Sequence, residues 1–355
     1  MRLPFLGSIG PDEGGYAYVA WQWAQGHPLY SSVWVDRPQG LIVVYRLLIS
    51  ISHSAWAIRL GAVLAGVAIT LLLVWIGGLA DSRRTGLLAG GLYAVAGVGP
   101  HIEGFTLNGE LAAAVPSTAA VAAAFVAWRR GSRGWLAAAG LLGGVALLMK
   151  QSGFDGLVVA MAVALAAAPR LRRVGLVVAG AAPPLAFSVG AGWLAGWHAY
   201  WSALVAYHFD ASIDDRRLEH LQDSLPAFAR DVLPLAVIAM VGLWVWRRRA
   251  YYRGFALVWL GAALVAVNVG GFYWPHYYVQ LLPPLCLLAA VALARIRVPA
   301  LGWATAAVVV IPALAFLGGL VQAPDSRQEQ LIKYALAYEN DERVAAYVRS
   351  HSSPS

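Results

Sequence analysis

The sequence predicts an all-α membrane protein that crosses the bilayer many times. Of its 355 residues, 60% are hydrophobic and only 12% are charged, with a mean hydropathy of +0.64. Soluble globular domains are about 25% charged. Apolar runs near the roughly 20 residues that a bilayer-spanning helix needs recur along the chain. Basic residues gather between alternate pairs of these runs, which is the loop asymmetry typical of multi-span proteins.

Two apolar segments near the N-terminus are too short to span. Residues 14–25 place Tyr16 and Trp23 on one face at helical spacing, and residues 38–51 begin with a proline, a favoured first-turn residue. Both segments are expected to be helices that lie in the membrane interface. Residues 1–54 are therefore predicted to form one extracytoplasmic loop that contains the catalytic groups.

Residues 55–321 are predicted to form the transmembrane domain, with about ten helices and a long outer loop at 195–230. Several spans are rich in Gly and Ala, which suits close helix packing. The expected spans are 55–79, 85–99, 109–128, 134–149, 152–168, 174–194, 231–246, 253–270, 277–294 and 299–321.

The loop charges predict the orientation. Fourteen of the 26 basic residues fall in alternate loops, and only Asp81 of the 18 acids shares that side. The positive-inside rule places these loops in the cytoplasm. The basic residues are Arg83, Arg84, Arg129, Arg130, Arg133, Arg170, Arg172, Arg173, Arg247, Arg248, Arg249, Arg253, Arg295 and Arg297. The remaining loops and both chain ends are then expected outside the cell.

The two ends of the chain lead to two further expectations. The opening residues MRLPFLGSIG lack the apolar core of a signal peptide, although the loop they open is predicted to be outside. We therefore expect a first span upstream of Met1. The tail at 322–355 contains a short amphipathic helix and is expected to be the start of an outer domain that is cut short.

Two acids open the outer loop. Asp12 and Glu13 stand next to each other in PDEGGY. A carboxylate at the membrane surface can act as a general base toward an acceptor hydroxyl or amine. Asp12 could equally cap the helix that starts near Gly14, with Glu13 favouring its positive end. Both roles can hold together.

Two cations have the chemistry of a phosphate site. Arg37 lies in Asp36-Arg37-Pro38, where its planar fork could bind phosphate at a helix start, snorkel to the interface or pair with Asp36. Lys150 stands in a short outer corner, Lys-Gln-Ser-Gly, against the charge trend of the loops. It could hold a phosphate or pyrophosphate, or snorkel.

Polar residues join two spans in HIEGFTLNGELAAAVP. Asn108 is expected to cap the next helix, and Glu110 to lie in its first turn, where the helix dipole tolerates an acid. Glu110 has the stronger functional case because it lies nearer the lipid boundary.

A histidine stands among interfacial aromatics in YWPHYY. His276 and Tyr277 could donate to phosphate, and aromatic faces can stack on sugar rings. His276 could also bind a metal, but the sequence has no HExxH pair and Cys286 is its single cysteine, so no metal site is predicted. A mixed-charge run from His208 to His220 is typical of a solvated face.

Several functions are not supported by the sequence. The arginines lie in short clusters between spans instead of along one soluble face, so nucleic-acid binding is not predicted. The chain has no Walker loop, no GxGxxG and no GxSxG, which argues against a nucleotide-driven pump and a serine hydrolase.

Taken in order, the motifs resemble the protein O-mannosyltransferase superfamily of C-type glycosyltransferases, in particular the bacterial branch that includes the aminoarabinose transferases. The resemblance covers nearly the whole chain, although each motif is short. One departure is Arg-Pro-Gln at residues 37–39, where the family has Lys-Pro-Pro. The motifs are Asp12-Glu13, Tyr16, Gly26 with Tyr30, Asp36-Arg37-Pro38-Gln39, the corner from His101 to Glu110, Lys150-Gln151-Ser152-Gly153, and His276-Tyr277 with Pro283-Pro284.

The resemblance implies a C-type glycosyltransferase fold and an inverting transfer of a sugar from a polyprenyl phosphate to an acceptor outside the plasma membrane. Asp12 would be the general base, assisted by Glu13. The leaving phosphate would be held by Arg37, Lys150, His276 and Tyr277. Asp36, Tyr16, Asn108 and Glu110 would support the acceptor side. No cofactor, nucleotide sugar or essential metal is expected, and the partners would be membrane lipid, the lipid-linked sugar and an acceptor of unknown kind (protein, lipid or envelope glycan).

Two other functions stay open. A transporter or lipid flippase would be expected to show paired halves and polar breaks at mid-membrane depth. An inactive fragment of the transferase family is the other alternative. The clustering of the charged motifs on one face favours the enzyme.

Overall fold

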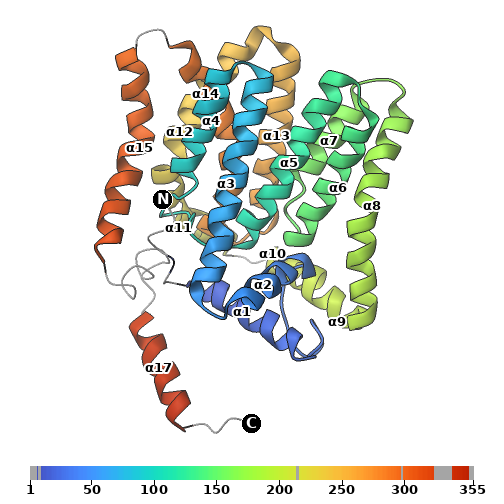
Figure 1. The fold of residues 1–355 in the computed structure, drawn as a ribbon, viewed down its shortest axis with the longest axis vertical. Coiled ribbons are helices and arrows are strands. Elements are labelled where there is room, and N and C mark those ends of the chain that lie inside the picture. Colours follow the sequence, from blue (N-terminus) through green and yellow to red (C-terminus); the bar gives the residue numbers. More distant parts are fainter. Residues whose placement is uncertain (1–5, 7–8, 213–215, 297–298, 324–337, 352–355) are drawn as a thin grey trace.

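The computed structural model describes residues 6, 9–212, 216–296, 299–323 and 338–351. These residues form helices joined by short loops, and the β-structure within them is one bridge between Leu29 and Val33 (Figure 1). The predicted all-α class is confirmed.

The longer helices follow the predicted spans. They are α3 (Ala55–Ala80), α4 (Arg83–Ala96), α5 (Gly109–Arg130), α6 (Arg133–Met149), α7 (Asp155–Leu165), α8 (Arg170–Ala195), α12 (Leu233–Val245), α13 (Ala250–Val269), α14 (Leu282–Arg295) and α15 (Pro299–Val321). The loops that the sequence predicts to lie outside contain α1 (Pro11–Ala24), α2 (Gln39–Ile51), α9 (Trp197–Trp201), the π-helix η2 (Ser202–Ala206), α10 (Tyr207–Ser212), α11 (Arg217–Asp231) and the 3₁₀ helix η4 (Pro275–Leu281). A 3₁₀ turn, η3 (Trp246–Arg248), follows α12, and α17 (Tyr338–His351) lies in the tail.

The predicted number of spans needs a correction. Five helices in the described part of the chain are long and apolar enough to cross a membrane: α3, α5, α8, α13 and the continuous η4–α14 segment. A sixth arises if α11 and α12, bent by 67°, count as one span. The predicted spans 85–99, 134–149, 152–168 and 231–246 correspond to α4, α6, α7 and α12, which have only 11 to 17 residues each.

The centre of the bundle is formed by α5 and η4–α14. In their most apolar windows, 78% and 94% of the residues are buried. Small residues allow the neighbouring helices to approach closely. A Cβ atom added at Gly140 of α6 would lie 2.1 Å from the carbonyl oxygen of Val177, and one at Gly180 of α8 would lie 2.0 Å from that of Ala137. This crossing therefore requires glycine on both helices.

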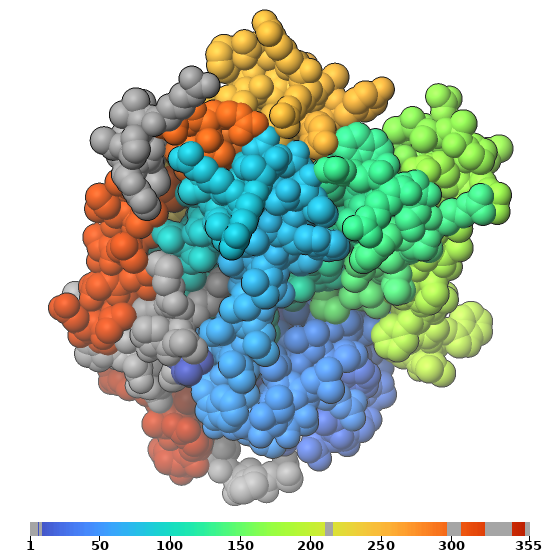
Figure 2. Space-filling view, turned by 45° about the horizontal axis from the view of Figure 1, so that its top comes forward, coloured from blue at the N-terminus to red at the C-terminus, as the bar shows by residue number. Residues whose placement is uncertain are grey.

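The bundle has two chemically different ends. The arginine-bearing junctions α3–α4, α5–α6, α7–α8, α12–α13 and α14–α15 lie at one end, called the arginine end below (Figure 1). The opposite end, called the site end, carries α1, α2, α9 and α11. In Figure 2 the arginine end is tilted toward the viewer, and α1 and α2 form a lobe below α3. The grouping of the arginine loops thus agrees with the sequence prediction.

The N-terminal lobe is tied into the bundle by its aromatic residues. Tyr16 of α1 packs edge-on against Tyr45 of α2, with ring centres 5.5 Å apart. The hydroxyl of Tyr45 donates to the carbonyl of Leu107 at 2.6 Å. α1 begins at Pro11 with Gly10 as its N-cap, so Asp12 lies inside the first turn and is not the cap.

The tail is described in part. Residues 338–351 form α17, in agreement with the predicted short helix. Residues 324–337 and 352–355, over which the rest of the predicted outer segment extends, lie outside the described residues.

Candidate active site

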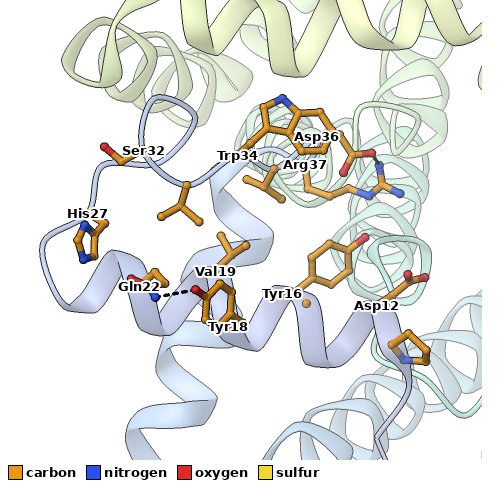
Figure 3. A pocket seen from close by; sticks show the side chains of 14 residues that line it. Asp12, Tyr16, Tyr18, Val19, Gln22, His27, Ser32, Trp34, Asp36 and Arg37 are labelled. Atoms are coloured by element: carbon orange, nitrogen blue, oxygen red, sulfur yellow. Dashed lines mark hydrogen bonds and ion pairs between the residues drawn. The ribbon is translucent and has the colours of Figure 1, made fainter. Parts of the chain in front are cut away.

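A polar pocket of about 740 Å³ lies between α1 and the segment from His27 to Arg37. Asp12 and Tyr16 project from α1, and Asp36 and Arg37 from the segment facing it. Figure 3 shows the side chains of Asp12, Tyr16 and Arg37 turned toward one another at one end of the pocket. Four predicted site residues therefore share one cavity. Gln22, His27 and Trp34, which were not predicted, also line it.

Two cations, the buried Lys150 and the largely buried Arg37, lie next to this end of the pocket, and we call them the cationic centre. Arg37 pairs with Asp36, and Lys150 pairs with Glu110. A Cβ atom at Gly109 would lie 3.5 Å from Cδ of Lys150 and 3.7 Å from Nε of Arg37, so this glycine lets both cations pack at the start of α5. The structure thus brings together two cations that are far apart in the sequence.

The cationic centre has an unused donor. Nε of Arg37 is buried and has no hydrogen-bond partner among the described residues. A buried unpaired donor is costly, so such a group is commonly explained by a ligand or an ion. An anion at this position would satisfy it.

Neighbouring charges tune both cations. Burial opposes the charge of Arg37, but the acidic groups of Tyr16 and Asp36 raise its pKa above the ordinary value. For Lys150, burial is the larger effect and lowers the pKa to about 8, although Glu110 favours the charged form. Arg37 is therefore a fixed charge, whereas Lys150 can change its charge near neutral pH.

Hydrogen bonds from three other segments hold the backbone around Arg37. The carbonyl oxygen of Asp36 accepts hydrogen bonds from Nε2 of Gln151 at 3.0 Å and from Nε2 of His208 at 2.9 Å. The hydroxyl of Tyr30 donates to the carbonyl of Arg37 at 3.1 Å. Burial, together with the charges of Arg37 and Lys150, lowers the pKa of His208. A neutral His208 can still donate this bond.

His276 stands between two acids. Its Nδ1 lies 3.3 Å from Oε2 of Glu103, and its Nε2 lies 3.5 Å from Oε1 of Glu110. Tyr277 follows it, and Nζ of Lys150 lies 3.8 Å from the centre of the Tyr277 ring. His276 and Tyr277 therefore adjoin the cationic centre.

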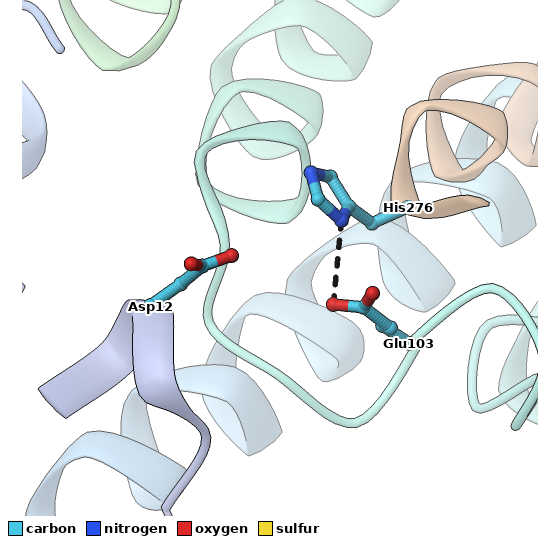
Figure 4. A group of neighbouring side chains, drawn as sticks. All are labelled: Asp12, Glu103 and His276. Carbon is cyan, nitrogen blue, oxygen red and sulfur yellow. Dashed lines mark ion pairs between the residues drawn. The ribbon is translucent and has the colours of Figure 1, made fainter. Parts of the chain in front are cut away.

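Asp12, Glu103 and His276 also form a group that could hold a divalent cation. One ligand atom from each lies within 4.8 Å of the others, and Glu103 and His276 are buried (Figure 4). Two carboxylates and an imidazole are a common ligand set for transition metals. The sequence predicts no metal site, and that prediction can be tested at these three residues.

Glu13 points away from these groups. Its carboxylate is fully buried, accepts from the backbone N–H of Gly10 at 2.9 Å and of Leu107 at 2.7 Å, and lies 3.1 Å from Nη2 of Arg59. This ion pair joins α1 to α3. Its contacts are those of a structural residue, so the structure separates Glu13 from the neighbouring Asp12.

Asn108 caps α5. Its side-chain oxygen accepts from the N–H of Leu111 at 2.8 Å, and its amide nitrogen donates to Thr106. The side chain is thereby engaged within its own loop. Of the two readings that the sequence allowed for Asn108, its contacts match the cap.

The loop between α4 and α5 is held by an acid that the sequence did not single out. Asp231, at the bend between α11 and α12, accepts from the backbone N–H of His101 and of Ile102, and its Oδ1 lies 2.8 Å from Nδ1 of His101. Glu103 follows two residues later. This anchor therefore sets the position of Glu103 relative to His276.

The loops of the site contain the left-handed backbone positions. Among the described non-glycine residues, Tyr30 (φ 69°), Glu103 (φ 53°) and Tyr273 (φ 46°) have positive φ. Each lies in a different outer segment. Strained backbone persists where surrounding contacts enforce it and is common at functional sites.

A second pocket, of about 360 Å³, lies on the far side of Lys150. Its lining is mainly apolar, with Leu204, Phe209 and Val269 among the residues, and Lys150 and His208 provide its polar groups. We call it the apolar pocket. The cationic centre thus lies where the polar and apolar pockets approach each other.

Sequence reasoning underestimated Glu103, Gln151 and His208. All three stand in motifs noted from the sequence, yet their partners lie far away along the chain. His208 and Gln151 both contact the carbonyl oxygen of Asp36, 172 and 115 positions away, and Glu103 lies beside His276. No spacing rule connects such distant loops.

Residues 36–193 match the family model described as dolichyl-phosphate-mannose-protein mannosyltransferase. The match includes Arg37, Glu110 and Lys150, whereas Asp12 and His276 lie outside it. Over these residues the chain is similar to that family of mannosyltransferases. The predicted family resemblance is confirmed.

Solved structures share the fold of this chain. ArnT from Cupriavidus metallidurans, bound to undecaprenyl phosphate, matches with a TM-score of 0.68 and 21% identity over 99% of this chain and 70% of that one. The oligosaccharyltransferase AglB from Archaeoglobus fulgidus, in complex with an inhibitory peptide and a dolichol-phosphate, matches with a TM-score of 0.53 and 12% identity over 89% of this chain and 52% of that one. No curated protein sequence matches the chain. The C-type glycosyltransferase fold is therefore confirmed.

Proposed function

We propose that this multi-pass membrane protein transfers a sugar from a polyprenyl-phosphate donor to an acceptor outside the cytoplasm. The observation that carries the proposal is the cationic centre, the largely buried Arg37 and the buried Lys150 between a polar pocket that contains Asp12 and an apolar pocket. Bound undecaprenyl phosphate and dolichol-phosphate in the two structural relatives support it.

The two pockets suggest where each substrate binds. The apolar pocket next to Lys150 suits the first part of a lipid chain, and its polar rim suits the phosphate. The polar pocket, lined by aromatic and hydrogen-bonding side chains, suits the sugar and the acceptor. The donor phosphate would then lie against Nε of Arg37, the buried donor that lacks a partner.

The transfer is a single displacement. The acceptor oxygen or nitrogen forms a bond to the anomeric carbon while the bond from that carbon to the phosphate oxygen breaks. The acceptor proton passes to the carboxylate of Asp12. Polyprenyl phosphate leaves with an added negative charge, which Arg37 and Lys150 stabilise; such preorganised charge is often the largest catalytic contribution. Glu13, through Arg59, positions α1 and with it Asp12.

The decisive experiment incubates the purified full-length chain with labelled undecaprenyl-phosphate sugars and membrane extract, and identifies the labelled acceptor by mass spectrometry. We expect transfer by the wild type. Asp12→Asn should reduce transfer about 100-fold or more, as loss of a general base does. It should leave binding of undecaprenyl phosphate unchanged. Asp223→Asn, an exposed acid on α11, is the matched control.

Other outcomes would point to other functions. Full transfer by Asp12→Asn would exclude Asp12 as the base. Movement of a lipid or solute across liposomes without transfer would instead support a transporter or flippase. Binding of the lipid phosphate with neither activity would support an inactive member of the family.

A chelator tests whether Asp12 acts as a base or as a metal ligand. We expect transfer to persist when a chelator is added. Loss of transfer, with recovery on adding Mn²⁺, would make Asp12, Glu103 and His276 metal ligands.

A further inference from the structure

A third cavity lies at the arginine end, away from the proposed active site. It has a volume of about 210 Å³, and its walls come from the ends of α5, α7 and α13. Its lining includes Trp128, Val163, Ala166, Tyr251, Gly254 and Val258. Tyr251 is 77% exposed, and a Cβ atom at Gly254 would meet nothing within 4 Å. This distal cleft is therefore apolar and open, with free space at Gly254.

Arginines lie close to the distal cleft, one of them bonded to its wall and others next to its lining residues in the sequence. Nη2 of Arg173 donates to the carbonyl of Val163 in the cleft wall at 3.3 Å, while its Nε is buried without a hydrogen-bond partner in the described part of the chain. Arg129 and Arg130 follow Trp128 directly, and Arg253 precedes Gly254. The side chains of these last three residues are exposed.

Acids that could neutralise this charge are scarce. Among the described residues, Asp81 is the one acid at the arginine end, and it is already bonded to Arg249 and Arg295 at 3.2 and 2.8 Å. The rim of the distal cleft consequently carries uncompensated positive charge beside an apolar interior. This combination complements an amphiphile with an anionic head.

We propose that the distal cleft binds an anionic phospholipid, with one acyl chain against Trp128, Tyr251 and Gly254 and the phosphate near Arg173. Guanidinium groups favour phosphate because paired N–H donors match its oxygens. Basic pockets between membrane helices are known places for acidic lipid head groups. The proposal does not depend on the proposed function, because the cleft is at the opposite end of the bundle from the cationic centre.

The test measures lipid binding to the purified full-length chain by native mass spectrometry and by thermal unfolding. The probes are phosphatidylglycerol and phosphatidylcholine with identical acyl chains. We expect at least a tenfold preference for phosphatidylglycerol, and a rise in the unfolding temperature with that lipid alone. Arg173→Gln should reduce the preference, and Gly254→Leu, which fills the cleft, should remove the bound lipid.

Matched variants control for charge and volume. Arg84→Gln removes an arginine of another junction, and Gly78→Leu adds the same side chain at an exposed helical glycine of α3. Both should keep the lipid response. If Gly254→Leu does not fold, Arg173→Gln together with Arg253→Gln tests the rim in an intact cleft. Equal binding of the two lipids, an unchanged response in the rim variants, or displacement of phosphatidylglycerol by undecaprenyl phosphate would overturn the proposal.

Discussion

Lys150 is the residue whose charge the site controls most directly. Its side chain is buried between Glu110 and the Tyr277 ring, and burial lowers its pKa to about 8. Below that pH the ammonium is present and can hold the donor phosphate. Above it the amine is neutral and the attraction is lost.

We therefore expect kcat/KM for the lipid-linked donor to fall as the pH rises through about 8. The kcat/KM profile reports groups of the free enzyme, which makes it the right measurement. Lys150→Arg should remove this inflection, because an arginine keeps its charge across the range. An unchanged inflection in Lys150→Arg would assign the titration to another group.

Glu13 has a different task from Asp12, although the two are adjacent. Removing one partner of a buried ion pair leaves the other charge uncompensated, at a typical cost of about 3–5 kcal/mol. Glu13→Gln should thus lower the unfolding temperature of the protein in detergent, and Glu13→Gln with Arg59→Gln should recover part of the loss. Asp12→Asn should leave that temperature unchanged. A Glu13→Gln variant that unfolds normally yet fails in transfer would restore Glu13 to the catalytic role that the sequence suggested.

At the scale of elements, α10 and the corner between α6 and α7 meet the segment that carries Arg37. His208 and Gln151 both donate to the carbonyl of Asp36, so two separate elements fix the direction in which Arg37 points. The net contribution of one hydrogen bond to the stability of such an arrangement is about 1 kcal/mol.

His208→Ala should therefore raise KM for the donor about fivefold, with a smaller change in kcat. His208→Gln can place an amide donor at the same carbonyl and should recover much of the loss. The two variants are compared by steady-state kinetics at several donor concentrations. If glutamine is no better than alanine, the imidazole itself acts on the substrate and is not a positioning group.

The sequence predicts features that depend on neighbouring residues better than features that depend on contacts between distant segments. Asn108 as a cap, Glu110 in the first turn of α5 and the positions of the helices follow from local patterns. The pairs Glu13–Arg59, Glu103–His276 and Asp231–His101 join distant segments. Adjacency in the sequence suggested that Asp12 and Glu13 act together, but successive positions on a helix point about 100° apart, so one faces the pocket and the other the bundle.

At the scale of the whole molecule, one acid connects several helices at the arginine end. Asp81 follows α3 and contacts Arg249 before α13, Arg295 at the end of α14 and Thr85 in α4. Burial opposes its ionisation, but the hydrogen bonds from Arg295 and Thr85 outweigh that effect and lower the pKa of Asp81.

Because the folded pKa lies below the unfolded value of about 3.9, this stabilisation is present above that pH and is lost as the pH falls through the folded pKa. Asp81→Asn should lower the unfolding temperature at pH 7, and the difference from the wild type should shrink below about pH 4. Thermal unfolding across this range checks the prediction, with Arg84→Gln as the control. A difference that stays constant with pH would mean that packing, not charge, accounts for the effect.

The whole-molecule charge pattern was readable from the sequence, since the arginine loops do gather at one end. The number of spans could not be predicted from the sequence, because hydropathy alone does not distinguish a short buried helix from a helix that crosses the bilayer by itself. Residues 155–165 show the difficulty: α7 has 11 residues, fewer than a bilayer requires, and is packed among longer helices.

The approach of the polar and apolar pockets at the cationic centre has a kinetic consequence. The acceptor and the sugar of the donor would occupy the polar pocket at the same time, while the donor's lipid chain lies in the apolar pocket and the anomeric carbon lies between Asp12 and the two cations. Such an enzyme works through a ternary complex, so initial-rate plots at several fixed acceptor concentrations should intersect instead of running parallel. It should also hydrolyse its donor slowly when no acceptor is present, because water cannot fill the acceptor's place with the same alignment.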